Sequence, residues 1–77
     1  MTAEQKQKFE GEVQTGIAPS LGNFNVMVDV VKNVLGGYVT EAVTINWKQV
    51  GGVLTIEHPW GKVHIQNEKT VNFEWYA

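Results

Sequence analysis

Apolar and polar residues alternate through four short segments in the second half of the chain, from Ala42 to Trp75. Successive side chains of a β-strand point to opposite faces of a sheet, so this alternation predicts strands with one apolar face. Turn-forming residues separate the segments, which favours an antiparallel meander over residues 42–76, with each strand beside the next. The apolar positions are Val43, Ile45 and Trp47, then Leu54 and Ile56, then Val63 and Ile65, and finally Val71, Phe73 and Trp75.

The turns between these segments set the register that we expect for the sheet. Each turn must bring apolar residues of neighbouring strands opposite each other, because a slip of one residue would turn the apolar face outward. In the central turn, Pro59 presets φ and Gly61 is suited to a left-handed conformation. The predicted pairs are Trp47 with Leu54, Ile56 with Val63, and Ile65 with Val71; the predicted loops are Gln49–Gly52, His58–Gly61 and Asn67–Lys69.

The valine-rich segment Phe24–Leu35 has the periodicity of a helix. At about 100° per residue its apolar side chains fill an arc of about 200°, and its polar residues fill the remaining side. Asn23 or Asn25 is suited to cap the start, and Gly36-Gly37 to end the helix in a left-handed cap. The sequence therefore predicts the main helix at residues 23–36.

The N-terminal segment, residues 1–17, carries signals for more than one conformation. Thr2-Ala3-Glu4-Gln5 has the form of a capping box and predicts a short helical start. Phe9, Val13 and Ile17 are spaced by four, which suits a helical stripe, yet they also share the parity of a strand. Glycines at positions 11 and 16 weaken either element. We therefore expect an extended segment after the helical start, with helix, strand and disorder left open.

Together these elements predict a single α+β domain over residues 1–77. Its expected form is one main helix packed on a four-stranded antiparallel meander in two layers, with a short N-terminal helix or extended segment. The apolar arc of the main helix is wider than one sheet layer requires. Val26, Val30 and Val34 therefore face either the N-terminal segment or a partner, and the sequence leaves both explanations open.

Composition narrows the class of protein. The chain has 77 residues, a net charge of −2 and no cysteine, so it forms neither a disulfide nor a thiolate metal site. The first residues are polar and lack the apolar stretch of a leader, and no apolar run approaches the roughly 20 residues of a membrane span. From these features we expect a cytoplasmic protein.

The residue types that catalysis requires are sparse. Ser20 and Asp29 are the single serine and the single aspartate, and their spacing gives no nucleophile–base pattern. Glu57 and Glu74 share the outer sheet face but lie on non-adjacent predicted strands, which suits surface residues better than a catalytic carboxylate pair. We therefore expect no enzymatic activity.

Metal and nucleic-acid sites are also disfavoured. His58 has the parity of the apolar face and lies at a turn, whereas His64 points to the opposite face, so the histidines do not share an ion. Lys48 and Lys62 accompany His64 on the outer face, but glutamates lie there too, and the chain has no arginine for phosphate or base contacts. We expect no metal, no cofactor and no nucleic-acid partner.

The remaining features point to protein binding. The chain has three tryptophans, and Trp60 occupies a turn tip beside proline, where it either anchors a partner or folds back over the sheet. We predict a small non-enzymatic interaction protein of a bacterial or phage accessory or inhibitor type. The alternative is a structural or small-ligand-binding subunit whose site forms only in an oligomer. The candidate partner-binding residues are Trp60, Trp75, Tyr76, Val26 and Val30.

The first and last predicted strands, Ala42–Lys48 and Thr70–Trp75, are the edges of the sheet. Edge strands expose unpaired backbone groups and are usually guarded by lysine, proline or a bulge. The stretch Thr70–Ala77 contains no lysine or proline and carries three aromatic residues. We therefore predict a homodimer, or an assembly of dimers, that uses this edge or the helix flank around Val30.

Overall fold

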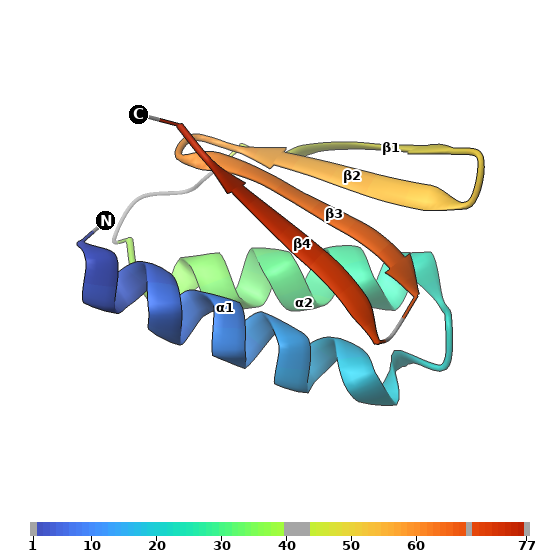
Figure 1. Cartoon of the computed structure of the whole chain (residues 1–77), viewed down its shortest axis with the longest axis horizontal. Coiled ribbons are helices and arrows are strands. Elements are labelled where there is room, and N and C mark those ends of the chain that lie inside the picture. The colour runs from blue at the N-terminus through green and yellow to red at the C-terminus, as the bar shows by residue number, and fades with distance from the viewer. Residues whose placement is uncertain (1, 40–43, 68, 77) are drawn as a thin grey trace.

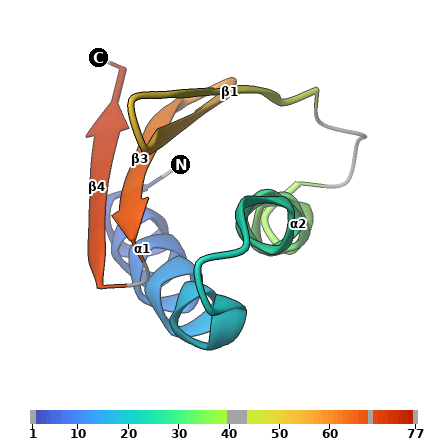
Figure 2. The ribbon, with the colours of Figure 1, turned by 90° about the vertical axis from the view of Figure 1, so that its right-hand side faces the viewer.

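A computed structural model describes residues 2–39, 44–67 and 69–76, and within them lie two α-helices and a four-stranded antiparallel sheet (Figure 1). The elements are α1 (Ala3–Ile17), the 3-10 helix η1 (Ala18–Ser20), α2 (Phe24–Gly36), β1 (Asn46–Val50), β2 (Val53–His58), β3 (Gly61–Asn67) and β4 (Thr70–Trp75). The strand order β1-β2-β3-β4 follows the sequence, so the predicted α+β class and the meander are confirmed. Both helices lie on the concave side of the curved sheet (Figure 2).

The N-terminal segment forms one continuous helix, α1, so of the alternatives left open for residues 1–17 the helix holds, and the expectation of one main helix with only a short helical start is corrected. Its predicted capping box is present: Thr2 Oγ1 accepts the Gln5 N–H at 3.1 Å, and Gln5 Oε1 accepts the Thr2 N–H at 2.9 Å. Phe9, Val13 and Ile17 are fully buried along one side of the helix. Burial of this stripe by the rest of the fold outweighs the low helix propensity of the two glycines.

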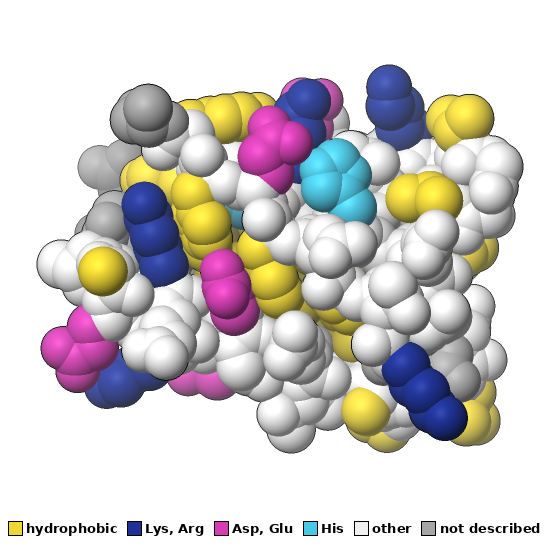
Figure 3. Space-filling model, viewed as in Figure 1, with side chains coloured by type: hydrophobic (Ala, Val, Ile, Leu, Met, Phe, Trp, Pro, Cys, Tyr) yellow, Lys and Arg dark blue, Asp and Glu magenta, His cyan; other side chains and the backbone are white. Residues whose placement is uncertain are grey.

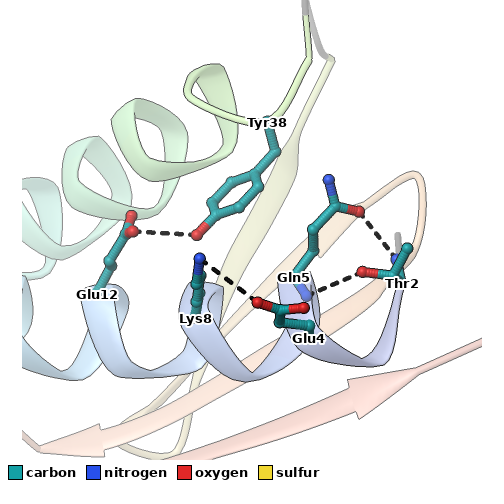
Figure 4. A network of polar contacts seen from close by, with 6 residues as sticks. All are labelled: Thr2, Glu4, Gln5, Lys8, Glu12 and Tyr38. Carbon is teal, nitrogen blue, oxygen red and sulfur yellow. Dashed lines mark hydrogen bonds and ion pairs between the residues drawn. The ribbon is translucent and has the colours of Figure 1, made fainter.

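α1 and α2 lie side by side under the sheet (Figures 1 and 2). Where they meet, a Cβ atom placed on Gly16 would lie 2.6 Å from Val30 Cγ1, so the contact requires glycine. Tyr38, just after α2, donates its hydroxyl to Glu12 of α1 at 3.0 Å (Figure 4). Desolvation, together with the hydrogen bond to and the charge of Glu12, raises the pKa of Tyr38. The N-terminal segment thus covers the Val30 flank, while Val26 remains 41% exposed.

Helix α2 confirms the predicted main helix, including its start. Asn23 Oδ1 accepts the backbone N–H groups of Asn25 and Val26 at 3.0 and 3.3 Å. The predicted left-handed end is wrong, because Gly37 has a φ of −79°. Its N–H instead bonds back to the Val34 carbonyl at 3.0 Å. The last turn of the helix is tightened by this hydrogen bond, which satisfies a carbonyl group at the helix end without a left-handed residue.

The central hairpin has the predicted register between β2 and β3. Its turn is shorter than predicted, because His58 and Gly61 already pair and leave only Pro59-Trp60 between them. Gly61 does not have the positive φ that the turn suggested. A Cβ atom on Gly61 would overlap the carbonyl oxygen of Glu74 on β4. Glycine is therefore required at this position by the close approach of β4, not by the turn conformation.

The first hairpin differs from the prediction by two residues, since Trp47 lies opposite Ile56 and not opposite Leu54. Gly51 and Gly52 are both left-handed, with φ values of 59° and 80°. This conformation gives a two-residue turn whose twist matches the flanking strands, so it fixes the shorter loop. A shift of two residues leaves every side chain on its predicted face. The predicted first strand begins at Ala42, whereas β1 begins at Asn46, and Thr44 and Ile45 precede it. Positions 42 and 43 lie outside the described residues.

The last hairpin pairs Ile65 with Val71, as predicted. The register shifts after Ile65, so Gln66 is an additional residue and Asn67 pairs with Thr70. The predicted loop Asn67–Lys69 is therefore one residue too long, because Asn67 already pairs with Thr70. Asn67 Oδ1 accepts the Thr70 N–H at 2.9 Å, which closes the turn around position 68, a residue outside the described chain. The bulge bends the end of β3 without changing the buried face.

The hydrophobic core lies between the two helices and the central strands. Burial decreases toward the edges of the sheet: every residue of β1 is exposed, and β4 alternates mainly between half-buried and exposed positions. The fully buried side chains are Phe9, Val13 and Ile17 of α1, Met27, Val31 and Leu35 of α2, and Leu54, Ile56, Val63 and Ile65 of β2 and β3. The edge strand β1 therefore receives little cover from the core.

Candidate protein-interaction surface

The sheet face that the helices leave uncovered is mainly polar, with Val50 and Val53 at its β1–β2 end. Glu57, Lys62 and Glu74 form a charged row across β2, β3 and β4, because Glu57 pairs with Lys62 and Lys62 with Glu74. Lys62 Nζ lies 3.8 Å from Glu57 Oε1, and His64 Nε2 lies 3.5 Å from Glu74 Oε1. Figure 3 shows acidic, basic and histidine side chains gathered over the strands. Such surface pairs stabilise a fold by about 1 kcal/mol or less. The charged row therefore contributes more to the recognition of a partner than to the stability of the fold.

His58 lies on the inner face at the end of β2 and is buried, which corrects its prediction as a turn residue. Its Nδ1 accepts the Trp60 backbone N–H at 3.2 Å, and its ring centre lies 5.8 Å from that of Phe9 and 5.5 Å from that of Trp75. Burial lowers the pKa of His58. His64 points to the opposite face, as predicted. In the part of the chain that the structure describes, no group of three or more acidic, histidine or cysteine residues is placed to hold a metal ion.

The single serine and the single aspartate occupy unrelated positions. Ser20 ends η1 and is buried, whereas Asp29 is exposed on α2. The connection between α1 and α2 lies at the opposite end of the molecule from the β2–β3 turn, which follows His58 (Figure 1). The structure therefore does not bring Ser20, Asp29 and His58 together as a nucleophile with its base.

Trp60 and Trp75, both predicted to bind a partner, are half-buried against the core. Trp75 Nε1 donates to Glu10 Oε2 at 2.8 Å, and Lys6 Nζ lies 5.4 Å from the Trp75 ring centre. The Tyr76 N–H donates to the Trp60 carbonyl at 2.9 Å. These contacts connect β4, the β2–β3 turn and α1, so both tryptophans contribute to the fold.

The other predicted partner-binding residues do not form one patch. Tyr76 and Val26 are 48% and 41% exposed, whereas Val30 is half-buried beside Gly16. The end of β4 and the start of α2 lie at opposite ends of the molecule (Figure 1). Ala77, the end of the predicted edge, lies outside the described residues. No single contact surface therefore includes this set.

Strand β1 carries apolar surface that the sequence analysis did not single out. All five of its residues are exposed, including Trp47 at 47% and Val50 at 67%. The alternation places Trp47 correctly on the inner face, but the core does not extend under this strand. The signal that could have found it is the polar surroundings of the tryptophan, Asn46, Lys48 and Gln49, which are typical of an edge.

A second exposed apolar residue lies in the connection between the helices. Leu21 is 91% exposed, and its backbone is left-handed with a φ of 55°. This conformation is unfavourable for leucine, since only glycine, asparagine and aspartate adopt it readily. Leu21 is a single side chain on a turn, whereas β1 offers side chains and backbone together, so β1 is the stronger candidate surface.

Comparison of the chain with protein-family models, with curated proteins and with solved structures found no match in any of the three. Among the residues described, neither α1 nor α2 has the length and apolar character needed to cross a membrane. The surface of β1 therefore has to be interpreted from its own geometry.

Proposed function

We propose that this chain is a small non-enzymatic interaction protein that binds another polypeptide by strand addition along β1. The observation that supports this function most directly is that β1 is an edge of the sheet and each of its five residues is exposed. An edge strand presents unpaired N–H and C=O groups, on which an extended segment of a partner forms a further strand.

The direction of the unpaired backbone groups follows from the hairpin register. Val50 and Val53 flank the two-glycine turn, so they exchange both of their backbone hydrogen bonds. Bonding alternates along an antiparallel pair, so the backbone groups of Trp47 and Gln49 point away from β2. These groups are the ones that an added strand would bond.

The side chains of β1 offer contacts on both faces of an added strand. Trp47 lies on the helix side of the sheet and Val50 on the other face. Tryptophan is enriched among the residues that contribute most to binding, because its large ring buries much apolar surface when the partner binds. The opposite edge is less suited, since Phe73 and Trp75 of β4 already contact the ring of Phe9 on α1.

The rest of the molecule is consistent with a binding role in the cytoplasm. The separate positions of Ser20, Asp29 and His58 support binding rather than catalysis. A chain without cysteine gains nothing from an oxidising compartment. The partner is a polypeptide rather than a nucleic acid, because glutamates share the outer face with the lysines and the chain has no arginine.

A capture experiment with matched variants tests this function. The immobilised chain is exposed to lysate and to extended peptides, beside the variants Trp47→Thr and Gln49→Pro. Trp47→Thr removes the exposed indole, and Gln49→Pro removes an outward N–H while the bonds from β1 to β2 remain. Tyr76→Thr is the control, because Tyr76 is 48% exposed and Trp47 is 47% exposed.

We expect both β1 variants to bind a captured polypeptide at least about tenfold more weakly than the unchanged chain. The Tyr76→Thr variant should bind it with unchanged affinity. Circular dichroism checks that each variant keeps the fold. A polypeptide that both β1 variants retain, or that only Tyr76→Thr loses, would contradict strand addition at β1.

A further inference from the structure

We infer that the strand added to β1 is β1 of a second copy of this chain, antiparallel to the first and related to it by a two-fold axis at Trp47. The two sheets then form one continuous sheet, with the helices of both copies on the same side. This inference rests on the proposed function, because it names the partner of the edge that the function uses.

The backbone of β1 is self-complementary about Trp47. In an antiparallel pair of identical strands, the axis falls either on a residue whose backbone groups point to the partner or on one whose groups point away. The groups of Trp47 point outward, so Trp47 exchanges both hydrogen bonds with Trp47 of the second copy. Gln49 of the second copy then lies opposite Ile45, the residue just before β1, and the reciprocal pair lies on the other side of the axis.

Charge selects this register over its neighbour. An axis at Lys48 would place two ammonium groups directly opposite each other, which destabilises a cross-strand pair. With the axis at Trp47, Lys48 of the second copy faces Asn46. Asn46 itself pairs with Glu57 on β2. Lys48 of the second copy therefore extends the charged row beyond Glu57, and negative and positive charges continue to alternate along the row.

A hollow beside Asn46 leaves space for this lysine. The hollow has a volume of about 100 Å³ and is lined by Asn46, Trp47, Lys48, Thr55 and Glu57. Asn46 and Thr55 are short side chains, so the long stem of Lys48 from the second copy passes over Asn46 toward the Glu57 carboxylate. An ion pair of this kind fixes the register more than it strengthens binding.

Trp47 supplies the apolar part of the contact on the helix side of the sheet. The indole rings of the two copies meet at the axis, and each is 47% exposed in the single chain. Pairing therefore removes apolar surface from water on both copies. A chain of 77 residues is small for a single hydrophobic core, so this added cover is a substantial gain.

The other surfaces predicted for a dimer are more occupied within the single chain. On the Thr70–Ala77 edge, Trp75 is half-buried and bonded to Glu10 of α1. On the helix flank, Val30 is covered where Gly16 approaches it. Contacts through either surface are outcomes that the test below distinguishes.

Mass measurement tests whether a second copy is the partner. Light scattering at micromolar to millimolar concentration should give twice the chain mass of 8.6 kDa. Trp47→Lys places like charges at the axis and Gln49→Pro removes a donor, so each variant should return to the mass of the single chain. Tyr76→Lys is the matched control and should leave the dimer intact. Circular dichroism of every variant separates loss of the dimer from loss of the fold.

Disulfide cross-linking tests the register. The chain has no cysteine, so introduced thiols report without background. A mixture of Asn46→Cys and Lys48→Cys places thiols directly opposite each other, with Cα atoms about 4.5 Å apart, inside the limit of about 7 Å for a disulfide. The mixture should form disulfide dimers about ten times faster than either variant alone. Asn72→Cys, on the outer face of β4, should form no disulfide cross-link.

A single-chain mass over the whole concentration range overturns the inference, as does a dimer that survives Trp47→Lys. A disulfide between copies of Asn72→Cys would show that the contact lies on β4. A fast disulfide from Lys48→Cys alone would show that the axis lies at position 48. Either result also overturns the inference. If the chain is monomeric but captures another polypeptide through β1, self-pairing fails and the proposed function stands. If the chain neither pairs nor captures through β1, both fail.

Discussion

The imidazole ring of His58 lies among aromatic rings from separate parts of the fold. The ring centres of Phe9, Trp60 and Trp75 lie between 5.5 and 6.3 Å from its own. Because Nδ1 accepts the Trp60 N–H, the neutral ring carries its proton on Nε2, which is buried without a partner in the described chain. The charged groups Glu10 and Lys6 contact Trp75 of this cluster. A charged imidazolium would therefore lose its hydration without gaining an ion pair.

Stability should consequently fall when His58 becomes protonated. Burial lowers the pKa of His58, so in mild acid the unfolded chain binds a proton that the folded chain does not. The free energy of unfolding should be highest above the ordinary histidine pKa of about 6.5 and should decrease as the pH falls below it. Urea unfolding at a series of pH values from about 7.5 to about 5 measures this slope.

Two asparagine variants isolate the residue responsible. His58→Asn keeps an acceptor for the Trp60 N–H and removes the titrating ring, so the slope with pH should flatten. His64→Asn removes the histidine of the outer face and should keep the slope. An unchanged slope in His58→Asn would show that the pH dependence arises elsewhere.

Among the elements, α1 contains two glycines with opposite surroundings. A Cβ atom on Gly11 would meet nothing within 4 Å, whereas on Gly16 it would lie 2.6 Å from Val30 Cγ1. Valine has one strongly preferred rotamer in a helix, so Val30 cannot turn aside without strain. Alanine at Gly11 therefore changes only the helix propensity. Alanine at Gly16 changes the helix propensity and, in addition, the distance between the two helices.

Alanine substitutions should separate these effects. Gly11→Ala should raise the free energy of unfolding by about 1 kcal/mol, the helix preference of alanine over glycine. Gly16→Ala should lower it by about 1–2 kcal/mol, because overpacking against Val30 exceeds that gain. Urea unfolding measures both. Adding Val30→Ala to Gly16→Ala should recover part of the loss, and equal effects of the two glycine substitutions would contradict a close helix contact at Gly16.

The hairpins differ in how far their sequences determine the register. For β2 and β3 the apolar positions and the proline turn agree on one register, and the structure has it. For β1 and β2, registers that differ by two residues bury the same faces, so alternation does not choose between them. The left-handed conformation of both Gly51 and Gly52 makes the choice. In α1, Phe9, Val13 and Ile17 satisfy helix and strand spacing alike, and only burial by the rest of the fold decides.

The candidate surface could be predicted less well than the fold, because parity gives the face of a side chain and not the extent of the core beneath it. Trp47 and Ile56 share the inner face, yet Ile56 is fully buried and Trp47 is 47% exposed. Trp60 and Trp75 lie at the turn and on the edge strand where the sequence places them, but both are half-buried against the core, so for Trp60 the alternative of folding back over the sheet holds. The cover of Trp75 includes α1, the element that the sequence left most open.

Across the whole molecule, burial decreases from the centre of the sheet to β1. Leu54 and Ile65 in the central strands are fully buried, whereas β1 is exposed throughout. A strand with few buried contacts opens at a low free-energy cost. β1 is therefore expected to open most readily in the single chain and to gain most from a second copy.

Amide hydrogen exchange resolved by residue should follow this gradient and depend on concentration. In dilute solution the N–H groups of Trp47 and Gln49 point to water, whereas that of Lys48 is directed at Thr55 of β2, so Trp47 and Gln49 should exchange faster. At a total chain concentration of about ten times the dissociation constant, about one fifth of the chains remain single, so pairing through β1 should slow both by about fivefold. Phe73 is the control on β4, because the same alternation points its backbone groups away from β3. Slowing at Phe73 instead of Trp47 would place the contact on β4 and contradict pairing through β1.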